Sequence, residues 1–424
     1  MSRRSSGADR GQTAPRPTAQ APSGAAPAAA GSVPVAPPPL PPGADVYAGI
    51  VGQSLHLAGI QHGPVEPAVS IVLPPLEPEK IFAGVATALE FGRRLALALG
   101  RPLRVVPLDH QPAEPLQAAI RAHLSTTGAS VQLSVVPQPL LPHTTVSRDD
   151  LWVVTYWTTA HAADVARRIG VLDPARVVYL IQDYEPGFHA WSVPFVLTRA
   201  TYHAGFHHVI NSAPLAAFLA QREGSQANHG LILAPHLDLD RLRAAAAARS
   251  PSRRVRVFFY ARPSKPRNLY QLGVAAVRAA ATRLEADGVE WEVITAGEPH
   301  PEVTLPGGNA ARGLGTLSWN DYFTLLSEVD VGLTLMHSPH PSHPPLEVAV
   351  SGGLTVTNDL DGSRLGFHPR ITAVPADPDA LAAALVDAVH RARAEGPGPF
   401  TPPEEGRLGE AMDTVIAKLL TRLP

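Results

Sequence analysis

The strongest constraint on this chain is a regular alternation of short apolar runs and amphipathic stretches, which occurs twice along its 424 residues. The first block contains expected strands at 69–76, 103–109, 130–136, 151–157, 176–183, 206–210 and 231–235. An amphipathic pattern at 79–100 predicts a helix after the first strand, and helical stretches separate several of the others. This alternation predicts a mostly parallel sheet covered by helices on both faces.

The alternation restarts after a helical piece and a Ser/Pro break at 239–252, where we expect the domain boundary. Strands are then expected at 254–261, 291–297, 329–336, 353–359 and 371–376, and helices near 267–285, 320–328, 344–351, 378–394 and 404–422. The sequence predicts an α/β fold of two Rossmann-like, doubly wound domains, 46–240 and 253–400, followed by a C-terminal helix within 401–424. A ligand cleft is expected between two such domains, at the carboxyl ends of their strands.

Residues 1–45 are rich in Pro, Ala, Gly and Ser, and such a composition cannot bury enough apolar surface to offset chain entropy. We therefore expect a disordered N-terminal tail. The tail starts with basic residues but has no continuous apolar run, so no export signal is expected. The chain has no cysteine and a net charge of −2, which excludes disulfides and thiol catalysis and gives no general attraction to nucleic acid. These features favour a cytoplasmic enzyme, with peripheral association at the inner face of the membrane left open.

Several common enzyme motifs are absent from the sequence. The glycines at 313 and 315 lack the third glycine and the preceding strand of a dinucleotide-binding loop. Neither a G-x-x-x-x-G-K-[ST] phosphate loop nor a G-x-S-x-G nucleophile motif occurs. Two Rossmann-like domains without such a loop favour the two-domain glycosyltransferases, whose second domain holds a nucleotide-sugar through side chains and a helix N-terminus.

Basic side chains follow the first strand of the second domain, at the start of a helix, in "FFYARPSKPRNLY". Fixed cations and free backbone N–H groups would carry the charge of a diphosphate there, so no metal is required; the alternative is a solvated basic loop. In "HSPHPSHPPLEVAVSGG" (337–353), Glu347 lies in the first turn of a helix, and its carboxylate can accept both hydroxyls of a ribose. His337, His340 and His343 suit hydrogen bonds to sugar or phosphate better than a metal site, because prolines separate them and no acidic ligand is near.

The predicted donor-binding residues are Arg262, Lys265, Arg267, Asn268, Gly297, Glu298, Ser338, His340, Ser342, Leu346, Glu347 and, from the first domain, Gly84. Gly84 lies between the first strand and its helix, where a missing side chain lets backbone approach a ligand or only eases helix packing.

The stretch "RVVYLIQDYEPGFHAW" (176–191) is an apolar strand that ends in two acids and several aromatic rings. We expect Asp183 and Glu185 to be the catalytic pair, one carboxylate deprotonating an acceptor hydroxyl or stabilising oxocarbenium-like charge. The predicted acceptor-binding residues are Thr155, Trp157, Thr158, Tyr184, Phe188, His189 and Trp191. The alternative is that Asp183 caps the following turn and the aromatic rings fill the core.

Four separated motifs carry a resemblance to a known family: "YWTTAH", "IQDYEPGFHAWS", "FYARPSKPRNLYQLG" and "SWNDYFTLLSEVDVGLTLMHSPHPSHPPLEVAVSGG". Together they resemble the bacterial WsaF-like rhamnosyltransferases that build S-layer and rhamnan-type surface glycans, in the family-4 group of the GT-B fold. The resemblance covers about residues 66–395. It implies a dTDP-activated deoxysugar, most often dTDP-L-rhamnose, on the second domain and a saccharide or lipid-linked saccharide acceptor on the first.

The broader family-4 enzymes carry two glutamates eight positions apart. Glu347 matches the second and Pro339 stands at the first, as in the "SPHPS" form of the narrower group. The competing hypothesis is a catalytically silent nucleotide-sugar or glycan-binding subunit of the same fold; a solute-binding protein is disfavoured by the missing export signal. The acceptor, the linkage, inversion against retention, and the oligomeric state are left open by the sequence.

Overall fold

The computed structural model describes residues 39–424, apart from 82–83, 110–112, 127, 129 and 225–229. The predicted disordered tail therefore lies outside the described residues up to position 38. The remainder of that tail leads into a 3-10 helix, η1 (Ala44–Tyr47), in which Ala44 is buried.

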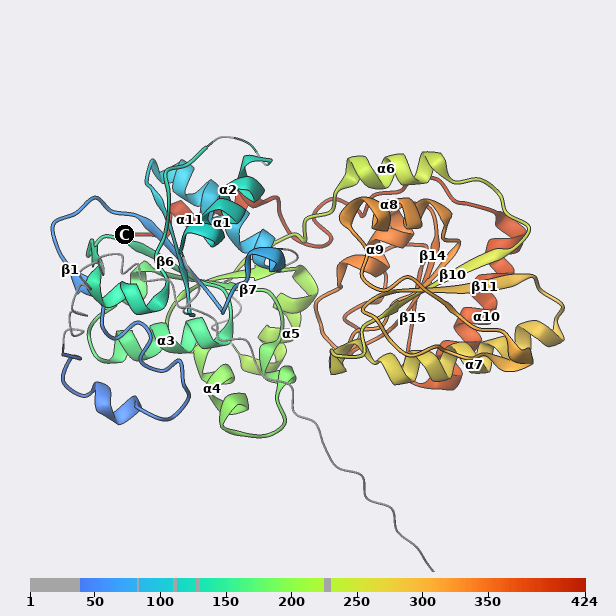
Figure 1. Cartoon of the computed structure of the whole chain (residues 1–424), viewed down its shortest axis with the longest axis horizontal. Coiled ribbons are helices and arrows are strands. Elements are labelled where there is room, and N and C mark those ends of the chain that lie inside the picture. The colour runs from blue at the N-terminus through green and yellow to red at the C-terminus, as the bar shows by residue number, and fades with distance from the viewer. Residues whose placement is uncertain (1–38, 82–83, 110–112, 127, 129, 225–229) are drawn as a thin grey trace, which may run out of the picture. The chain divides into compact units, whose positions relative to one another are not determined.

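The first domain is built on a parallel sheet of seven strands in the order β4-β3-β2-β6-β7-β8-β9 (Figure 1). The strands are β2 (Val69–Leu73), β3 (Leu103–Pro107), β4 (Leu133–Val135), β6 (Leu151–Val154), β7 (Val177–Ile181), β8 (His207–Asn211) and β9 (Leu231–Leu233). All residues of β2, β6 and β7 are buried, because helices cover both faces of the sheet, and this is why they read as continuous apolar runs. The expected strands are confirmed; β8 is shifted by one residue, and the others are shorter at one or both ends.

The helices of this domain are α1 (Gly84–Leu99), α2 (Ala113–Ser125), α3 (Trp157–Arg168), α4 (Val193–Thr201) and α5 (Ala213–Glu223). The chain builds the sheet outward from β2 through β3 to β4, then returns to the other side of β2 with β6. The carboxyl ends of β2 and β6 therefore form the topological switch point, where ligands of doubly wound sheets bind. A small parallel pair outside the main sheet, β1 (Gln61–His62) with β5 (Thr145–Val146), was not expected.

The second domain has a parallel sheet of six strands in the order β12-β11-β10-β13-β14-β15. They are β10 (Val255–Ala261), β11 (Trp291–Gly297), β12 (Arg312–Gly313), β13 (Val331–Leu333), β14 (Leu354–Asn358) and β15 (Ile371–Val374). The helices are α6 (Leu239–Ala248), α7 (Tyr270–Ala286), α8 (Trp319–Glu328), α9 (His343–Val350) and α10 (Pro378–Glu395). Its switch point lies between β10 and β13. The two doubly wound α/β sheets confirm the predicted fold class.

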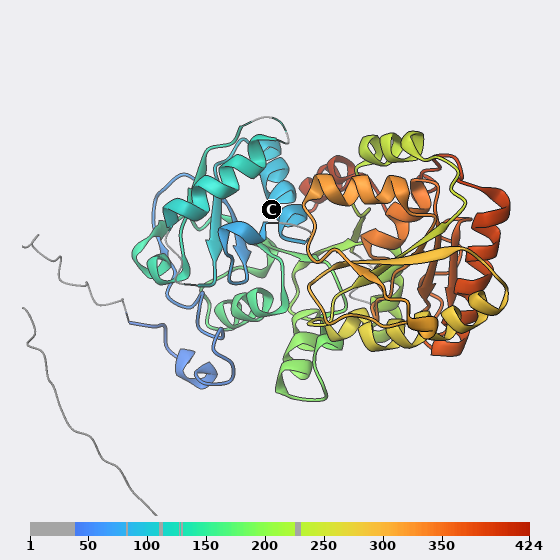
Figure 2. The same ribbon diagram turned by 45° about the vertical axis from the view of Figure 1, so that its right-hand side comes forward.

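Strand β10 shows how the second sheet is covered on both faces (Figure 2). Val257 and Phe259 point into a core shared with α7 and α10, whereas Phe258, between them, joins a core shared with α6 and α8. Alternate residues of a strand face opposite sides of its sheet, so one apolar run serves two cores. Leu242 and Ala245 of α6 lie in the second of these cores, so α6, which the sequence places at the boundary, packs with the second domain.

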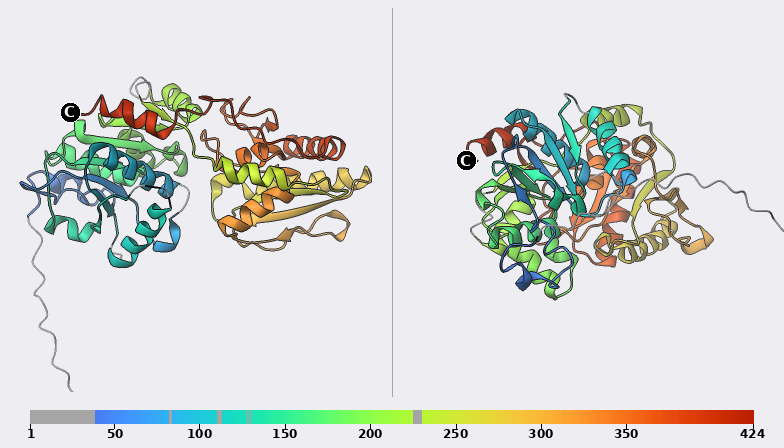
Figure 3. Two further views of the ribbon diagram at one scale, coloured as in Figure 1. Left: turned by 90° about the horizontal axis from the view of Figure 1, so that it is seen from above. Right: turned by 60° about the vertical axis from the view of Figure 1, so that its left-hand side comes forward.

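The last helix of the chain, α11 (Met412–Leu420), returns to the first domain (Figure 3). Val415, Ile416 and Leu419 share a core with residues of β2 and β3, and the Glu410 N–H donates to the Ile232 carbonyl at 2.9 Å. The helix begins later than the expected 404–422. None of the helices among the described residues is long and apolar enough to cross a bilayer.

Candidate functional site

Asp183 follows β7 at its carboxyl end and is 7% exposed. Its Oδ1 accepts the Tyr184 N–H at 2.8 Å and also the hydroxyl of Ser338, a residue of the second domain. Its Oδ2 lies 4.0 Å from Nη1 of Arg267, which also belongs to the second domain. Burial raises the pKa of Asp183, while Arg267 and the Ser338 hydroxyl oppose that rise. One buried carboxylate therefore joins the strand end of the first domain to two loops of the second.

Glu185, the other predicted catalytic acid, has a different environment. Its Oε2 accepts the N–H of Trp157, the first residue of α3, at 2.5 Å, and its own N–H donates to the Tyr202 hydroxyl at 3.1 Å. Burial raises the pKa of Glu185 well above its ordinary value. This carboxyl satisfies an orphan donor at a helix N-terminus, so the geometry gives it a structural task. Of the two acids, Asp183 is the one that reaches the second domain.

Three of the predicted acceptor-binding residues lie just after β6. The Thr155 hydroxyl donates to the Val72 carbonyl at 2.9 Å, and Trp157 and Thr158 are buried in the first turn of α3. The sequence placed these residues on the strand, but β6 ends at Val154 and the chain turns into a helix. Thr155 remains at the switch point, where its hydroxyl holds neighbouring strand ends together.

Of the aromatic residues after β7, Tyr184 and His189 contact other residues of the first domain, whereas Phe188 contacts the second domain. Tyr184 is half-buried, with its hydroxyl donating to Glu223 at 2.7 Å, and His189 meets the edge of Trp157 at 5.2 Å between ring centroids. Phe188 lies under the guanidinium of Arg267, whose Cζ is 4.4 Å from the ring centroid. Phe188 is thus the aromatic residue of this group that contacts the second domain.

Trp191 is 92% exposed and stacks on Phe195 of α4, with ring centroids 5.5 Å apart and planes within 8° of parallel. Val193 and Val196 on the same helix are also exposed, whereas Thr198 and Thr201 are buried. A surface helix normally buries its apolar face, so α4 presents the opposite arrangement. The result is an exposed apolar surface that includes two parallel aromatic rings.

The basic loop after β10, which the sequence predicts to bind the donor, is positioned by the register of β10 and β11. Ala261 pairs with Gly297, so the next residues along the two strands, Arg262 and Glu298, are neighbours, and Arg262 Nε donates to Glu298 Oε1 at 3.3 Å. The N–H and hydroxyl of Ser264 also donate to Glu298. Although burial works against it, these bonds from Ser264 lower the pKa of Glu298. Glu298 therefore shapes the loop that carries Arg262.

Gly297 has φ of 136°, and a Cβ there would lie 2.5 Å from the Ala261 carbonyl oxygen. Only glycine fits both the conformation and the contact. Asn268 is buried and its side-chain amide donates to the Leu335 carbonyl at 3.1 Å, so it links the loop to the segment that follows β13. Lys265 is exposed on the same loop. Gly297 and Asn268 have structural tasks here, and Lys265 is left facing solvent.

Arg267 connects this loop to the residues before α9. Its carbonyl accepts the His337 N–H at 2.6 Å, and its guanidinium lies between Phe188 and Asp183. Its Nε is buried and has no hydrogen-bond partner among the described residues. A buried donor without a partner is rare in native structures, so this nitrogen is free to donate to a ligand.

The segment before α9 is tightly folded. The Ser338 hydroxyl accepts the His340 N–H at 3.0 Å, and His340 Nδ1 accepts the Ser342 N–H at 3.1 Å. Ser342 has φ of 65°, an unfavourable left-handed conformation for a residue with a side chain, and such strain is typical of functional loops. Nε2 of His340 and Nε2 of His343 are buried without partners among the described residues.

Burial lowers the pKa of His340 to about 3 and that of His343 to about 4, so both rings are neutral at physiological pH. Neutral rings suit the predicted role as hydrogen-bond donors to a sugar or phosphate. Within the described part of the chain, no three His, Cys, Asp or Glu side chains are grouped closely enough to hold a metal ion.

Glu347 is 3% exposed, and its Oε2 accepts the hydroxyl of Tyr322 on α8 at 2.6 Å. Burial raises the pKa of Glu347 to about 7.

Leu346 is fully buried in a small core with Phe367 and Leu408, so its side chain packs inward. Gly84, at the start of α1, packs on the residue before Asp183: a Cβ there would lie 3.0 Å from Oε1 of Gln182.

Two family models match the chain. Residues 68–212 match the model described as "WsaF, N-terminal domain", and residues 255–386 match "WsaF, C-terminal domain". The two matched ranges correspond to the two sheets and together cover more than half of the chain. The chain contains both domains of the WsaF family. Asp183 lies in the WsaF N-terminal domain, and Arg267, Ser338 and Glu347 lie in the WsaF C-terminal domain.

A sequence relative is the "O-antigen biosynthesis protein RfbC" of Myxococcus xanthus, which is 32% identical over 318 residues. The match takes in 73% of this chain but 23% of the relative, so the chain spans about a quarter of that protein.

Solved structures with a similar fold include HepE of Anabaena in complex with UDP and glucose, with a TM-score of 0.54, 13% identity, and coverage of 83% of this chain and 98% of that one. Sucrose-phosphate synthase of Thermosynechococcus elongatus has a TM-score of 0.50 and 13% identity, over 84% of this chain and 94% of that one. These likenesses, with the two WsaF domains, establish the GT-B fold.

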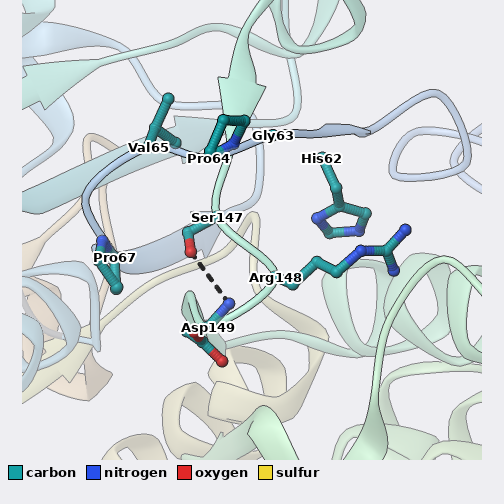
Figure 4. Close-up of a pocket in the computed structure, with 8 residues that line it drawn as sticks. All are labelled: His62, Gly63, Pro64, Val65, Pro67, Ser147, Arg148 and Asp149. Atoms are coloured by element: carbon teal, nitrogen blue, oxygen red, sulfur yellow. Dashed lines mark hydrogen bonds between the residues drawn. The ribbon is translucent and has the colours of Figure 1, made fainter.

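Two cavities, of about 460 and 320 Å³, lie in the WsaF N-terminal domain at the other end of its strands. The lining of the cavity of about 460 Å³ includes His62, Ser147, Arg148 and Asp149, which precede β2 and β6 (Figure 4). Ser147 Oγ accepts the Asp149 N–H at 3.1 Å, and the Asp149 carboxylate pairs with Arg176 at 2.8 Å. Asp183 follows the opposite, carboxyl end of β7, so these cavities are separate from the candidate site.

Sequence reasoning missed two contributors in the WsaF C-terminal domain. Tyr322, the partner of Glu347, lies inside the quoted motif "SWNDYFTLL" but was not singled out. Arg364 lies in the loop after β14, is 1% exposed, and donates to main-chain carbonyls of the segment before α9. A lone arginine between "DGS" and "LG" gives no sequence signal of burial, because arginine is almost never fully buried.

Proposed function

We propose that this chain is a glycosyltransferase that transfers a deoxysugar, L-rhamnose from dTDP-L-rhamnose, to a saccharide acceptor during surface polysaccharide biosynthesis. The observation that carries the proposal is the position of the Asp183 carboxylate. It is buried at the switch-point edge of the first sheet and contacts Arg267 and Ser338 of the nucleotide-binding half of the fold. The two WsaF domains and the O-antigen relative support the polysaccharide context.

In the proposed reaction, the acceptor oxygen forms a bond to the anomeric carbon of the donor, and the bond from that carbon to the diphosphate oxygen breaks. Asp183 takes the proton of the acceptor hydroxyl, and dTDP leaves with the electron pair. A base with a pKa nearer the working pH is more effective, and burial raises the pKa of Asp183 in that direction. Arg262, Lys265 and Arg267 neutralise the charge that develops on the diphosphate.

The nucleotide is proposed to bind along the donor loop and the start of α9. Glu347 accepts the ribose hydroxyls, with Tyr322 orienting its carboxylate through the 2.6 Å hydrogen bond. The unpartnered Nε2 atoms of His340 and His343 and the unpartnered Nε of Arg267 are the donors that a phosphate or sugar would satisfy.

On the acceptor side, the parallel rings of Trp191 and Phe195 are proposed to stack on a sugar of the acceptor. The flat apolar face of an aromatic ring matches the C–H face of a sugar ring. The Ser192 hydroxyl accepts the Phe195 N–H at 3.5 Å and caps α4, which keeps the two rings in fixed relation.

The nucleotide specificity is tested by thermal unfolding of the whole chain with dTDP, UDP and GDP. A ligand at a hundredfold its dissociation constant is expected to add about 2.7 kcal/mol of stability. We expect the largest shift in melting temperature with dTDP; a larger shift with UDP or GDP contradicts the assigned donor. Release of dTDP from dTDP-L-rhamnose, measured with and without a rhamnose-containing oligosaccharide, then separates transfer from silent binding.

Replacing Glu347 by Gln is expected to raise stability and weaken nucleotide binding together. The pKa of Glu347 is about 7 in the folded chain against an ordinary value of 4.5, so its contribution to stability is present at low pH and lost as the pH rises through 7. At pH 8 the buried charge therefore costs about 3 kcal/mol, which a neutral Gln removes. Glu347→Gln should melt at a higher temperature than the unaltered protein at pH 8, with little difference at pH 5.

The same titration predicts that dTDP binding by the unaltered protein weakens as the pH falls from 8 to 6, because a protonated carboxyl accepts fewer hydrogen bonds from ribose. Calorimetric titration of Glu347→Gln should give a weaker affinity that changes less over this range than that of the unaltered protein, in which Glu347 titrates together with the terminal phosphate of dTDP. The exposed Glu328→Gln on α8 is the control and should behave as the unaltered protein. An unchanged dTDP affinity in Glu347→Gln contradicts the ribose assignment.

A further inference from the structure

We propose that Arg364 is a positioning residue for nucleotide-sugar binding, which it serves by fixing the shape of the segment from Met336 to Ser342. This inference rests on the proposed function. Arg364 lies in the loop between β14 and β15, and its side chain is buried, with 1% of the residue exposed. Both terminal nitrogens of its guanidinium donate to protein groups, so we argue that it acts through the segment that it holds.

The guanidinium gathers three carbonyls of one segment. Nη2 donates to the carbonyls of Met336 at 2.7 Å, Ser338 at 3.1 Å and His340 at 3.3 Å. Alternate carbonyls of an extended strand point in the same direction, but three of them meet one nitrogen only if the segment curves around it. The curve is therefore defined by where Arg364 places its nitrogen.

The second terminal nitrogen of the guanidinium and the main chain of Arg364 are anchored to β14 and the residue that follows it. Nη1 donates to the hydroxyl of Thr357 at 2.8 Å, and the main-chain N–H of Arg364 donates to Oδ1 of Asp359 at 3.1 Å. The Thr357 hydroxyl in turn donates to the Thr334 carbonyl, just beyond β13, at 2.7 Å. Arg364 thus ties the curved segment to the ends of two neighbouring strands.

The curve has direct consequences for the candidate site. With its carbonyl turned toward Arg364, Ser338 directs its hydroxyl to the carboxylate of Asp183. Ser342 is held in its left-handed conformation at the start of α9, and the unpartnered Nε2 of His340 is held beside the loop that carries Arg267. One buried guanidinium therefore sets the orientation of several groups that the proposed function assigns to the donor.

The chemistry of the contact requires arginine. A guanidinium presents several N–H groups in a fixed planar fork, whereas a lysine ammonium is a point charge on a flexible stem. No carboxylate is hydrogen-bonded to the Arg364 guanidinium among the described residues, and burial lowers its pKa to about 10, which leaves it cationic at pH 8. The Asp183 and Asp359 carboxylates oppose the effect of burial on this pKa. Burying a cation is costly unless its donors are satisfied, so the guanidinium depends on the carbonyls of the segment as the segment depends on it.

The test compares Arg364→Lys with Arg249→Lys in the whole chain. Arg249 also lies in the second domain, donates to the carbonyls of Val329 and Ser351, and has a pKa that burial lowers to about 10. Arg249 is therefore also an arginine that donates to main-chain carbonyls, but it contacts Ser351, which follows α9, and not the segment before that helix. Both variants are expected to lower the melting temperature by several degrees.

The two variants should differ in nucleotide binding. We expect Arg364→Lys to raise the dissociation constant of dTDP, measured by calorimetry, at least tenfold, and to raise KM for dTDP-L-rhamnose while KM for the acceptor is unchanged. Arg249→Lys should change neither by more than about twofold. Should Arg364→Lys fail to fold, Arg364→Gln, which keeps one neutral donor, takes its place with the same expectation.

Equal dTDP affinities in the Arg364 and Arg249 variants, at temperatures where both are folded, overturn the inference. If the unaltered protein binds neither dTDP nor UDP, the proposed function itself fails and the inference falls with it. Normal dTDP binding with loss of turnover alone also overturns it, because the residue would then act on the reaction and not on the donor.

Discussion

Asp183→Asn is expected to lower turnover at least a hundredfold while the protein stays folded. A positioned general base contributes about 10²–10⁴ to the rate, and an amide of the same size lacks both the charge and the basicity. The Asn oxygen can still accept from the Tyr184 N–H and the Ser338 hydroxyl, so the local structure should persist. The measurement is the initial rate at saturating donor and acceptor, with circular dichroism as the check on folding.

The pH profile gives this prediction a second readout. Because burial raises the pKa of Asp183, turnover of the unaltered protein should fall as the pH drops through that raised value. The Asn variant should lose this acidic limb, and its dTDP affinity should change by less than tenfold. Asp173→Asn, before the amino end of β7, is the matched control and should leave turnover unchanged. Near-normal turnover in Asp183→Asn would make the strand-end acid structural.

Arg267→Ala is expected to lower turnover by about a hundredfold or more and to weaken dTDP binding as well. Removing one preorganised charge donor from a developing anion costs about 2.7–4 kcal/mol in the transition state. Arg267 also lies 4.0 Å from the Asp183 carboxylate and opposes the effect of burial on its pKa. Without that cation the pKa of Asp183 should rise further, so the acidic limb of the pH profile should move to higher pH.

The control for this variant is Arg278→Ala on α7, whose side chain is exposed and donates to the Thr304 carbonyl. Its turnover and dTDP affinity should match those of the unaltered protein. Arg267→Ala could lose dTDP affinity but keep its turnover at saturating donor. That result would mean that the arginine binds the ground state and the transition state equally. The proposal that Arg267 stabilises the charge developing on the leaving diphosphate would then be wrong.

The central strands of both sheets were predictable because they are buried on both faces and therefore appear as apolar runs. Strands of two residues gave no such signal: β12 (Arg312–Gly313) and the β1–β5 pair were missed. Strand ends were overestimated for a related reason. Val153 and Val154 continue into "TYW" without a polar break, but the chain leaves the sheet at Thr155 and Trp157 starts a helix.

Candidate residues near the strand ends were also predictable, since parallel strands bring their carboxyl ends to one edge. The tasks of individual side chains were not. Asp183 and Glu185 are two positions apart and look equivalent in sequence, but one contacts the second domain and the other caps α3. Local spacing carries no information about which distant backbone N–H or hydroxyl a carboxylate will meet.

The sequence by itself determined the two doubly wound domains, because apolar periodicity records which side chains must leave water. It also placed the basic donor loop and the acids after β7. Only the tertiary structure decided that Ser338 meets Asp183, that Glu347 is paired with Tyr322, that α11 packs on the first domain, and that Arg364 lies buried among carbonyls. These contacts join residues far apart in the chain, and hydrogen-bond partners depend on distance and direction in space, which no local pattern encodes.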